Sequence, residues 1–181
     1  MNRFAFLLCG LMLLTACADD KKPPPPRYPS WVNVPSGWEF YAGNSGEPHY
    51  VVKSASSLPG SIRIKYRVDG SGVKSLDGGT PLVTFILWRA NDNMSCAGEY
   101  QQYRYFGNPR MSLDPGEHEY DTPLDPARWT DCYGKPGTDF PDRFKGTVDN
   151  IWKVGFGFGG NFAGHGAIST GATFTLLEFN P

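Results

Sequence analysis

The hydrophobic and polar positions that follow residue 30 alternate with the two-residue period of β-strands. Ile62, Ile64, Tyr66 and Val68 are separated from one another by charged residues. Because successive side chains of a strand point to opposite faces, this alternation predicts a strand with one buried and one solvent-facing side. The segment 82–88 is apolar on both faces apart from one threonine, which is typical of a central strand covered on both sides.

Other segments rich in β-branched and aromatic residues also predict strands. Trp152, Val154, Phe156 and Phe158 fall on one face of such a segment. Pro, Gly, Asp and Asn residues interrupt these segments and predict turns. The strands expected in addition to the two above are 49–53, 100–106, 117–122, 151–158 and 172–179.

Helix signals are sparse, and a short helix is expected only within 141–150. Many short strands separated by Gly- and Pro-containing turns are typical of sandwiches and jelly rolls. The sequence therefore predicts an all-β domain at 31–181, an antiparallel β-sandwich of the jelly-roll type with at most one short helix. Its length is sufficient for one hydrophobic core.

The first residues predict export. Arg3 precedes an apolar run at 4–14, which is too short for a membrane-spanning helix of about 20 residues but has the length of a secretory signal. Leu14-Thr15-Ala16-Cys17 follows it and resembles the lipobox of bacterial lipoproteins. This resemblance implies a signal peptide at 1–16, cleavage before Cys17 and lipidation of Cys17. An ordinary signal peptide cleaved elsewhere is the alternative.

The lipoprotein resemblance also implies a location. Attached acyl chains would anchor the chain to a membrane of the cell envelope. Ala18 follows the cysteine, and the absence of Asp at that position favours the outer membrane over the inner membrane. Residues 17–30 then form a linker, in which Pro23–Pro26 favour an extended polyproline conformation.

The net charge bears on the class of ligand, and the cysteines bear on the disulfides of the domain. The net charge is −1, so the basic excess typical of nucleic-acid-binding proteins is missing. Of the four cysteines, Cys9 leaves with the signal and Cys17 carries lipid. Cys96 and Cys132 remain in an exported domain, where disulfides persist. A disulfide between them is expected, and a buried pair of free thiols is the alternative.

Aromatic residues make up 14% of the chain, and they suggest binding. In the predicted strand 100–106, Gln101, Tyr103 and Tyr105 share one face and Arg104 lies on the other. In a two-layer sandwich one face of this strand would face solvent. Exposed rings beside polar side chains can hold sugars, because a ring covers an apolar sugar face while polar groups meet hydroxyls.

Two further sets of residues carry alternative chemistry. His165 lies between two glycines on a predicted loop, where it would be either a ligand contact or an ordinary surface histidine. Four carboxylates could form the acid pair of a polysaccharide hydrolase or lyase, namely Glu99, Glu117, Glu119 and Asp121. Serine-nucleophile, phosphate-loop and zinc-protease motifs are not found in the sequence.

The stretches 154–160, 164–166 and 173–177 resemble the closing strands of galactose-binding-like jelly rolls. Together with 124–129, they make the chain similar to carbohydrate-binding-module-like domains of exported bacterial proteins. This resemblance implies non-catalytic binding of a glycan or envelope polysaccharide. It also implies a structural calcium ion between the first and last strands, where Glu39 and Glu178 stand. A structural envelope lipoprotein with a protein partner is a further alternative.

Overall fold

The computed structural model describes residues 29–43, 47–92 and 103–181. Within these residues the chain is built mainly of strands, with one α-helix and two short 3-10 helices. In chain order the elements are β1 (Val32–Asn33), β2 (Glu39–Ala42), β3 (Pro48–Ser54), β4 (Ser61–Asp69), β5 (Val73–Ser75), β6 (Leu82–Arg89), β7 (Arg104–Gly107), β8 (Met111–Ser112), β9 (Gly116–Pro123), η2 (Pro126–Arg128), β10 (Trp129–Asp131), η3 (Gly137–Asp139), α1 (Pro141–Asp149), β11 (Ile151–Gly159), β12 (Ala167–Ser169) and β13 (Thr173–Asn180).

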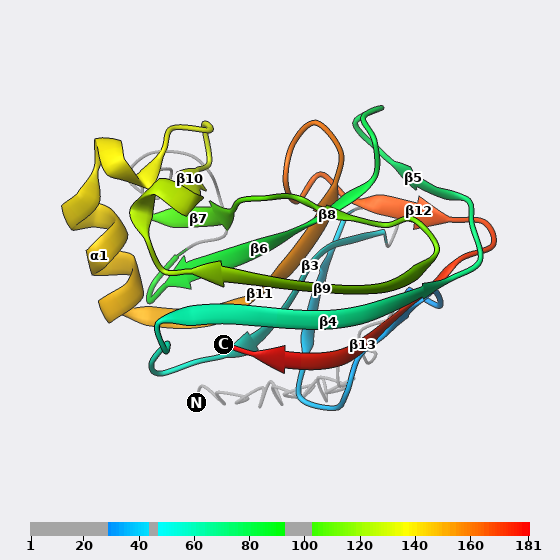
Figure 1. Ribbon diagram of the computed structural model, residues 1–181, viewed down its shortest axis with the longest axis horizontal. Helices are drawn as coiled ribbons and strands as arrows, with labels where there is room; N and C mark the ends of the chain where they lie inside the picture. Colours follow the sequence, from blue (N-terminus) through cyan, green and yellow to red (C-terminus); the bar gives the residue numbers. More distant parts are fainter. Residues whose placement is uncertain (1–28, 44–46, 93–102) are drawn as a thin grey trace, which may run out of the picture.

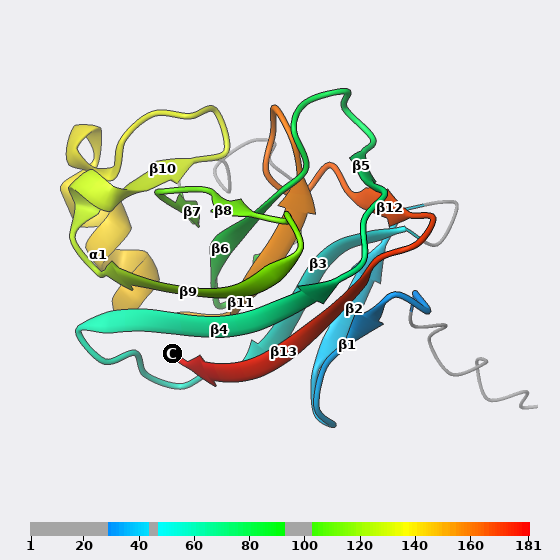
Figure 2. The same ribbon diagram turned by 45° about the vertical axis from the view of Figure 1, so that its right-hand side comes forward.

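The strands form two facing sheets and a small third one. The smaller facing sheet has the order β1-β13-β4-β9, and the larger has the order β10-β7-β6-β11-β3-β2 with β8 beside β6. Figures 1 and 2 show the smaller sheet lying across the larger, with α1 at one end and the β12–β5 pair at the other. Neighbouring strands are antiparallel except β1 and β13. The predicted all-β antiparallel sandwich is confirmed.

Strand β4 shows why the sequence adopts this arrangement. Ile62, Ile64, Tyr66 and Val68 are all buried, and the charged residues between them face outward. The outward residues of β4 lie opposite acidic residues of β9, with Lys65 in register with Glu119 and further pairs on either side. Opposite charges at facing positions stabilise such a pair of strands modestly. The expected one-sided burial of this strand is confirmed.

The core between the sheets is held together by aromatic rings. Phe174 of β13 packs against Tyr66 of β4 with ring centroids 4.8 Å apart. It also contacts Phe156 and Phe158 of β11, at 5.3 and 5.4 Å. Because Tyr66 and Phe174 belong to the smaller sheet and the two phenylalanines to the larger, this cluster joins the layers. Burial of four large rings is a major part of the hydrophobic stabilisation.

The outer face of the larger sheet is also apolar. Val52, Ile86, Trp88 and Phe106 form a second buried cluster there, so the prediction of two-sided burial for β6 is confirmed. The loop that follows β11 helps to cover this face. Gly164 in that loop has φ +73°, and a Cβ there would lie 2.1 Å from the Tyr50 ring. Only glycine fits at such a position.

The sequence misplaced one residue of the core and did not predict several short elements. Trp152 does not share a face with Phe156, because the pairing of β11 with β6 shifts register between Ile151 and Lys153. Trp152 is consequently 37% exposed. A bulge of this kind reverses the side-chain direction on one side of it. The strands not predicted are β1, β2, β5, β8, β10 and β12.

Among the described residues, no helix has the length and hydrophobicity needed to cross a membrane.

The aromatic cluster between the sheets predicts a large cost for truncating Phe174. Phe174→Ala should lower the free energy of unfolding of the purified chain by about 3–5 kcal/mol, because it leaves a cavity between three rings. The control Leu177→Ala, at an exposed residue of the same strand, should cost less than about 0.5 kcal/mol. Urea unfolding followed by fluorescence measures both. Equal losses for the two variants would show that the sheets are joined elsewhere.

Candidate functional site

The site that the structure favours is a cleft of about 410 Å³ above one end of the larger sheet. Thr84 of β6 and Phe106 of β7 form its floor. One wall is the 160–166 loop after β11, and the other is the 131–134 turn after β10. Figures 1 and 2 show both segments on the same side of the molecule. We call this the aromatic cleft and define it by Thr84, Phe106, Arg110, Tyr133, Phe162 and His165.

The walls of the aromatic cleft carry exposed rings. Tyr133 is 64% exposed and Phe162 is 59% exposed. The His165 side chain is 54% exposed, and its ring lies 5.0 Å from that of Phe162 at an angle of 31°. Large rings that stay in solvent beside a concave surface commonly mark a binding site. Ring faces combined with polar neighbours suit a ligand that is apolar on one side and hydroxylated at its edges.

Asp77 fixes the loop that carries Phe162 and His165. It lies between β5 and β6, and its carboxylate accepts the backbone N–H of Phe162 at 2.8 Å and that of Gly160 at 3.3 Å. The other carboxylate oxygen accepts the N–H of Gly79 at 3.2 Å. The side chain is only 8% exposed. The cleft wall is therefore held by one carboxylate that bridges two distant segments.

The environment of Asp77 shifts its ionisation. Desolvation by burial raises the pKa of this carboxyl, but the hydrogen bonds from Phe162, Gly79 and Asn161 outweigh it and lower the pKa from 3.8 to about 2. Backbone N–H groups favour the charged form because a carboxylate accepts hydrogen bonds more strongly than a neutral acid. Asp77 is consequently ionised in the folded protein at all physiological pH values.

Asp131 organises the opposite wall in a similar way. Its Oδ1 atom accepts the backbone N–H groups of Tyr133 and Lys135, both at 2.9 Å. Asp131 is buried, so this contact fixes the turn that presents the Tyr133 ring. The next residue, Cys132, is disulfide-bonded. Cys96 lies outside the described residues, so the Cys96–Cys132 pairing stays a prediction.

The structure corrects the predicted ligand contacts at Tyr105 and Arg104. Tyr105 faces the core, where its ring meets Phe144 edge-on at 4.9 Å. Burial raises its pKa to about 12. Arg104 faces outward but is covered, and its Nε donates to Asp92 at 2.9 Å. The prediction failed because it assumed a bare outer face, whereas the second apolar cluster and its covering segments bury that face.

The remaining residues predicted to bind ligand are Tyr103, Gln101 and His165, and they differ in where they lie. Tyr103 is half-buried, and the guanidinium of Arg89 lies 4.3 Å from its ring centroid, so one ring face is already occupied. Gln101 lies outside the described residues. His165 is on a loop, as expected, and it lines the aromatic cleft. The structure therefore brings His165, but neither Tyr105 nor Arg104, to the cleft.

The residues assigned to a calcium ion do not fit one. Glu39 lies on β2 of the larger sheet and is ion-paired with Lys153, whereas Glu178 lies on β13 of the smaller sheet. The Lys153 contact is the main reason why the pKa of Glu39 is lowered. Over the described ranges, no group of three or more His, Cys, Asp or Glu side chains could hold a metal. Calcium needs six to eight oxygen ligands, and these two carboxylates do not supply such a set.

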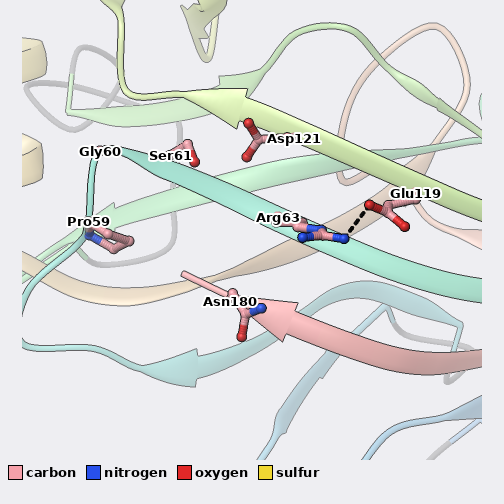
Figure 3. A pocket seen from close by; sticks show the side chains of 7 residues that line it. All are labelled: Pro59, Gly60, Ser61, Arg63, Glu119, Asp121 and Asn180. Carbon is pink, nitrogen blue, oxygen red and sulfur yellow. Dashed lines mark hydrogen bonds and ion pairs between the residues drawn. The ribbon is translucent and has the colours of Figure 1, made fainter.

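A second depression, the acidic groove, tests the hydrolase alternative. It is about 700 Å³ in volume and is lined by Pro59, Gly60, Ser61, Arg63, Glu119, Asp121 and Asn180. Figure 3 shows the Arg63 guanidinium turned toward Glu119, with which it forms an ion pair. Glu117 pairs in turn with Lys65 at 3.4 Å, and Glu99 lies outside the described residues.

The acidic groove lacks the features of a glycosidase site. Catalytic carboxylates flank the scissile bond of a bound sugar, and the described residues that line this groove include no aromatic ring to hold one. Arg63 and Glu119 are each 47% exposed and already paired with one another. Such a surface pair adds little stability and is typical of a solvated sheet face. The geometry favours the aromatic cleft as the functional site.

Comparison with known proteins gives no further guide. No protein-family model matches the sequence, and the searches of curated proteins and of solved structures find no match either.

Sequence reasoning did not identify Tyr133 and Phe162. Both are single aromatic residues within short turn-forming stretches, Asp131–Gly134 and Gly160–Gly164. An aromatic residue among turn-forming residues does not belong to the alternating apolar pattern of a strand, so its ring is not expected in the core. This position in a turn is the signal that could have identified Tyr133 and Phe162. Their proximity across the cleft depends on β10 and β11 belonging to one sheet, which the sequence does not reveal.

The lowered pKa of Asp77 predicts an acid-sensitive stability. A carboxyl whose pKa is lower in the folded state stabilises the fold above its unfolded pKa, and this contribution is lost as the pH falls through the folded pKa. Asp77→Asn should therefore lower the free energy of unfolding by about 2 kcal/mol at pH 7. The difference from the parent should shrink between about pH 4 and pH 2.

Urea unfolding at pH 7, 4 and 2.5 measures this dependence. Asp149→Asn is the matched control, because Asp149 is an exposed aspartate on α1 whose ion pair is with Lys145 one helical turn away, and its effect should be small at every pH. A stability difference for Asp77→Asn that stayed constant from pH 7 to 2.5 would contradict the role given to its charge.

Proposed function

We propose that this chain is an exported, lipid-anchored β-sandwich that binds a saccharide without catalysis at the aromatic cleft. The observation that supports it is the group of exposed rings, Tyr133, Phe162 and His165, on the walls of one concave site. A volume of about 410 Å³ suits one or two sugar residues, since pockets for small ligands begin at roughly 300 Å³.

Rigidity of the cleft supports the same proposal. Asp77 holds the Phe162 loop and Asp131 holds the Tyr133 turn, in each case through backbone N–H groups. A ring that is already fixed in its binding position loses little entropy when a ligand arrives. Saccharides gain only modest free energy from each contact, so preorganised rings matter more for them than for apolar ligands.

Polar groups around the cleft complete the chemistry expected of a sugar site. Asn108 and Asn161 line it and are exposed, and Thr84 lies on its floor. Amide and hydroxyl groups both donate and accept hydrogen bonds, as sugar hydroxyls do. A site of this kind orients its ligand and needs no nucleophile or acid pair.

The rings predict that truncating either one weakens binding. Phe162→Ala and Tyr133→Ala should each lower the affinity for a bound polysaccharide by about tenfold, because each removes one stacking surface. Affinity electrophoresis in native gels containing xylan, pullulan, polygalacturonate or solubilised peptidoglycan measures retention. The exposed Leu177 lies on the other sheet, so Leu177→Ala is the matched control and should migrate like the parent. Retention that Phe162→Ala and Tyr133→Ala leave unchanged would overturn the site.

The proposed anchor has its own test. Cys17→Ala should abolish incorporation of a palmitate analogue. Cys9→Ala, within the predicted signal peptide, is the control and should behave like the parent. Incorporation of the palmitate analogue that survives Cys17→Ala would rule out Cys17 as the lipidated residue. Separation of the inner and outer membranes of cells that express the parent would test the proposed outer-membrane location.

A further inference from the structure

The charges of the aromatic cleft identify the class of saccharide. This inference rests on the proposed function, because it concerns the ligand of that same site. Apart from the tyrosines Tyr50 and Tyr133, the charged or titratable side chains that line the cleft are Arg110, Asp131 and His165. Asp131 is buried and directs its Oδ1 to backbone N–H groups, whereas Arg110 is exposed. The side that a ligand would meet is therefore positively charged.

Arg110 is held in place by one end of its guanidinium group. Its Nη1 donates to the backbone carbonyls of Gly160 and Asn161, both at 2.7 Å. These carbonyls belong to the loop that carries Phe162, so the cation and the ring form one unit. Within the part of the chain that the structure describes, Nε and Nη2 of Arg110 have no hydrogen-bond partner. These two nitrogens therefore remain available to donate hydrogen bonds to a ligand.

Three other arginines of the described residues are instead ion-paired with carboxylates. Arg63 pairs with Glu119, Arg67 with Asp69 and Arg104 with Asp92. Over residues 29–43, 47–92 and 103–181, no carboxylate lies within ion-pair distance of Arg110. Asp77 stays ionised behind the same loop, where its carboxylate is 8% exposed, accepts the N–H groups of Phe162 and Gly160 and lies 4.0 Å from Nδ1 of His165. Arg110 thus presents an uncompensated positive charge at a concave aromatic site.

We propose that the aromatic cleft binds a saccharide that carries an anionic group, and that this group pairs with Arg110. The planar guanidinium offers two parallel donors to a carboxylate or to a phosphate ester. Stacking of the sugar ring on Phe162 or Tyr133 then places the substituent of the ring beside the cation. The aromatic rings provide affinity for the sugar, and Arg110 provides selection for its charge.

Pairs of polymers that differ only in charge separate the contribution of the anionic group to affinity from that of the sugar ring. Polygalacturonate is compared with its fully methyl-esterified form, and phosphomannan with unphosphorylated mannan, by affinity electrophoresis of the full chain. The parent should bind at least one anionic member about tenfold or more tightly than its neutral partner, since a charge-assisted bidentate pair is worth at least that factor. The two pairs distinguish a carboxylate from a phosphate. Raising the salt concentration should weaken only the anionic interaction.

Variants of Arg110 test whether this residue causes the preference for the anionic polymer. Arg110→Gln should remove the preference for the anionic partner, so that the ratio of the two affinities falls to about one. Arg110→Lys keeps the charge but not the planar pair of donors, and it should retain a reduced preference. Arg128→Gln, at an exposed arginine of η2 outside the cleft, should leave the ratio unchanged. The measured quantity is the ratio of the affinities for the anionic and the neutral polymer. A substitution that merely displaced the loop would lower both affinities and leave this ratio unchanged.

The outcomes separate this inference from the proposed function. Binding of neutral and anionic partners with equal affinity, lost in Phe162→Ala, would overturn the charge selection and leave the sugar site standing. A charge preference that survives Arg110→Gln would also overturn the assignment to Arg110. Retention by no polysaccharide of the panel, neutral or anionic, would overturn the proposed function and this inference with it.

Discussion

The larger sheet is apolar on both faces, and the rest of the structure follows from the need to bury both. One face packs on the smaller sheet through the ring cluster around Phe174. The other face carries Trp88 and Phe106, and the described residues form no second sheet to cover it. Its cover comes from side chains such as Tyr41 and Tyr50, whose rings meet Trp88 edge-on, and from the segments between strands. The aromatic cleft lies beside this cover, between the segments that provide it.

Electrostatic contacts to the backbone explain how irregular segments form a defined site. Asp77 and Asp131 each satisfy two or more N–H groups that no sheet would satisfy. Backbone groups in loops must find such partners when they are removed from water. The same contacts hold both carboxylates against the backbone and leave Arg110 as the exposed permanent charge of the cleft. Structural requirements of the loops and the charge of the site are thus linked in this fold.

The local pattern of apolar and polar residues was sufficient to predict the long strands but not the residues of the aromatic cleft. The alternation in β4 and the two-sided apolar run in β6 predicted their burial, and the segment 141–150 contains the one α-helix of the described residues. The position of Arg104 could not be predicted, because its burial depends on Asp92 and Trp88, which stand on or beside another strand. Likewise, Tyr133 and Phe162 share a cleft only through sheet order. Cross-strand neighbours of this kind leave no trace in the spacing of residues.

The charged pairs between β4 and β9 have a consequence for crowding. Strand β9 is the edge of the smaller sheet, and its outward side chains opposite the basic residues of β4 are Glu117, Glu119 and Asp121. An edge strand with open backbone groups invites pairing with the same edge of another molecule, and charge on that strand opposes it. The lipid anchor proposed above would confine copies of the chain to two dimensions and so raise the rate at which they meet. The charged side chains of β9, which pair with basic residues of β4, would then disfavour edge-to-edge pairing between neighbouring copies, so that close packing of the copies does not become aggregation.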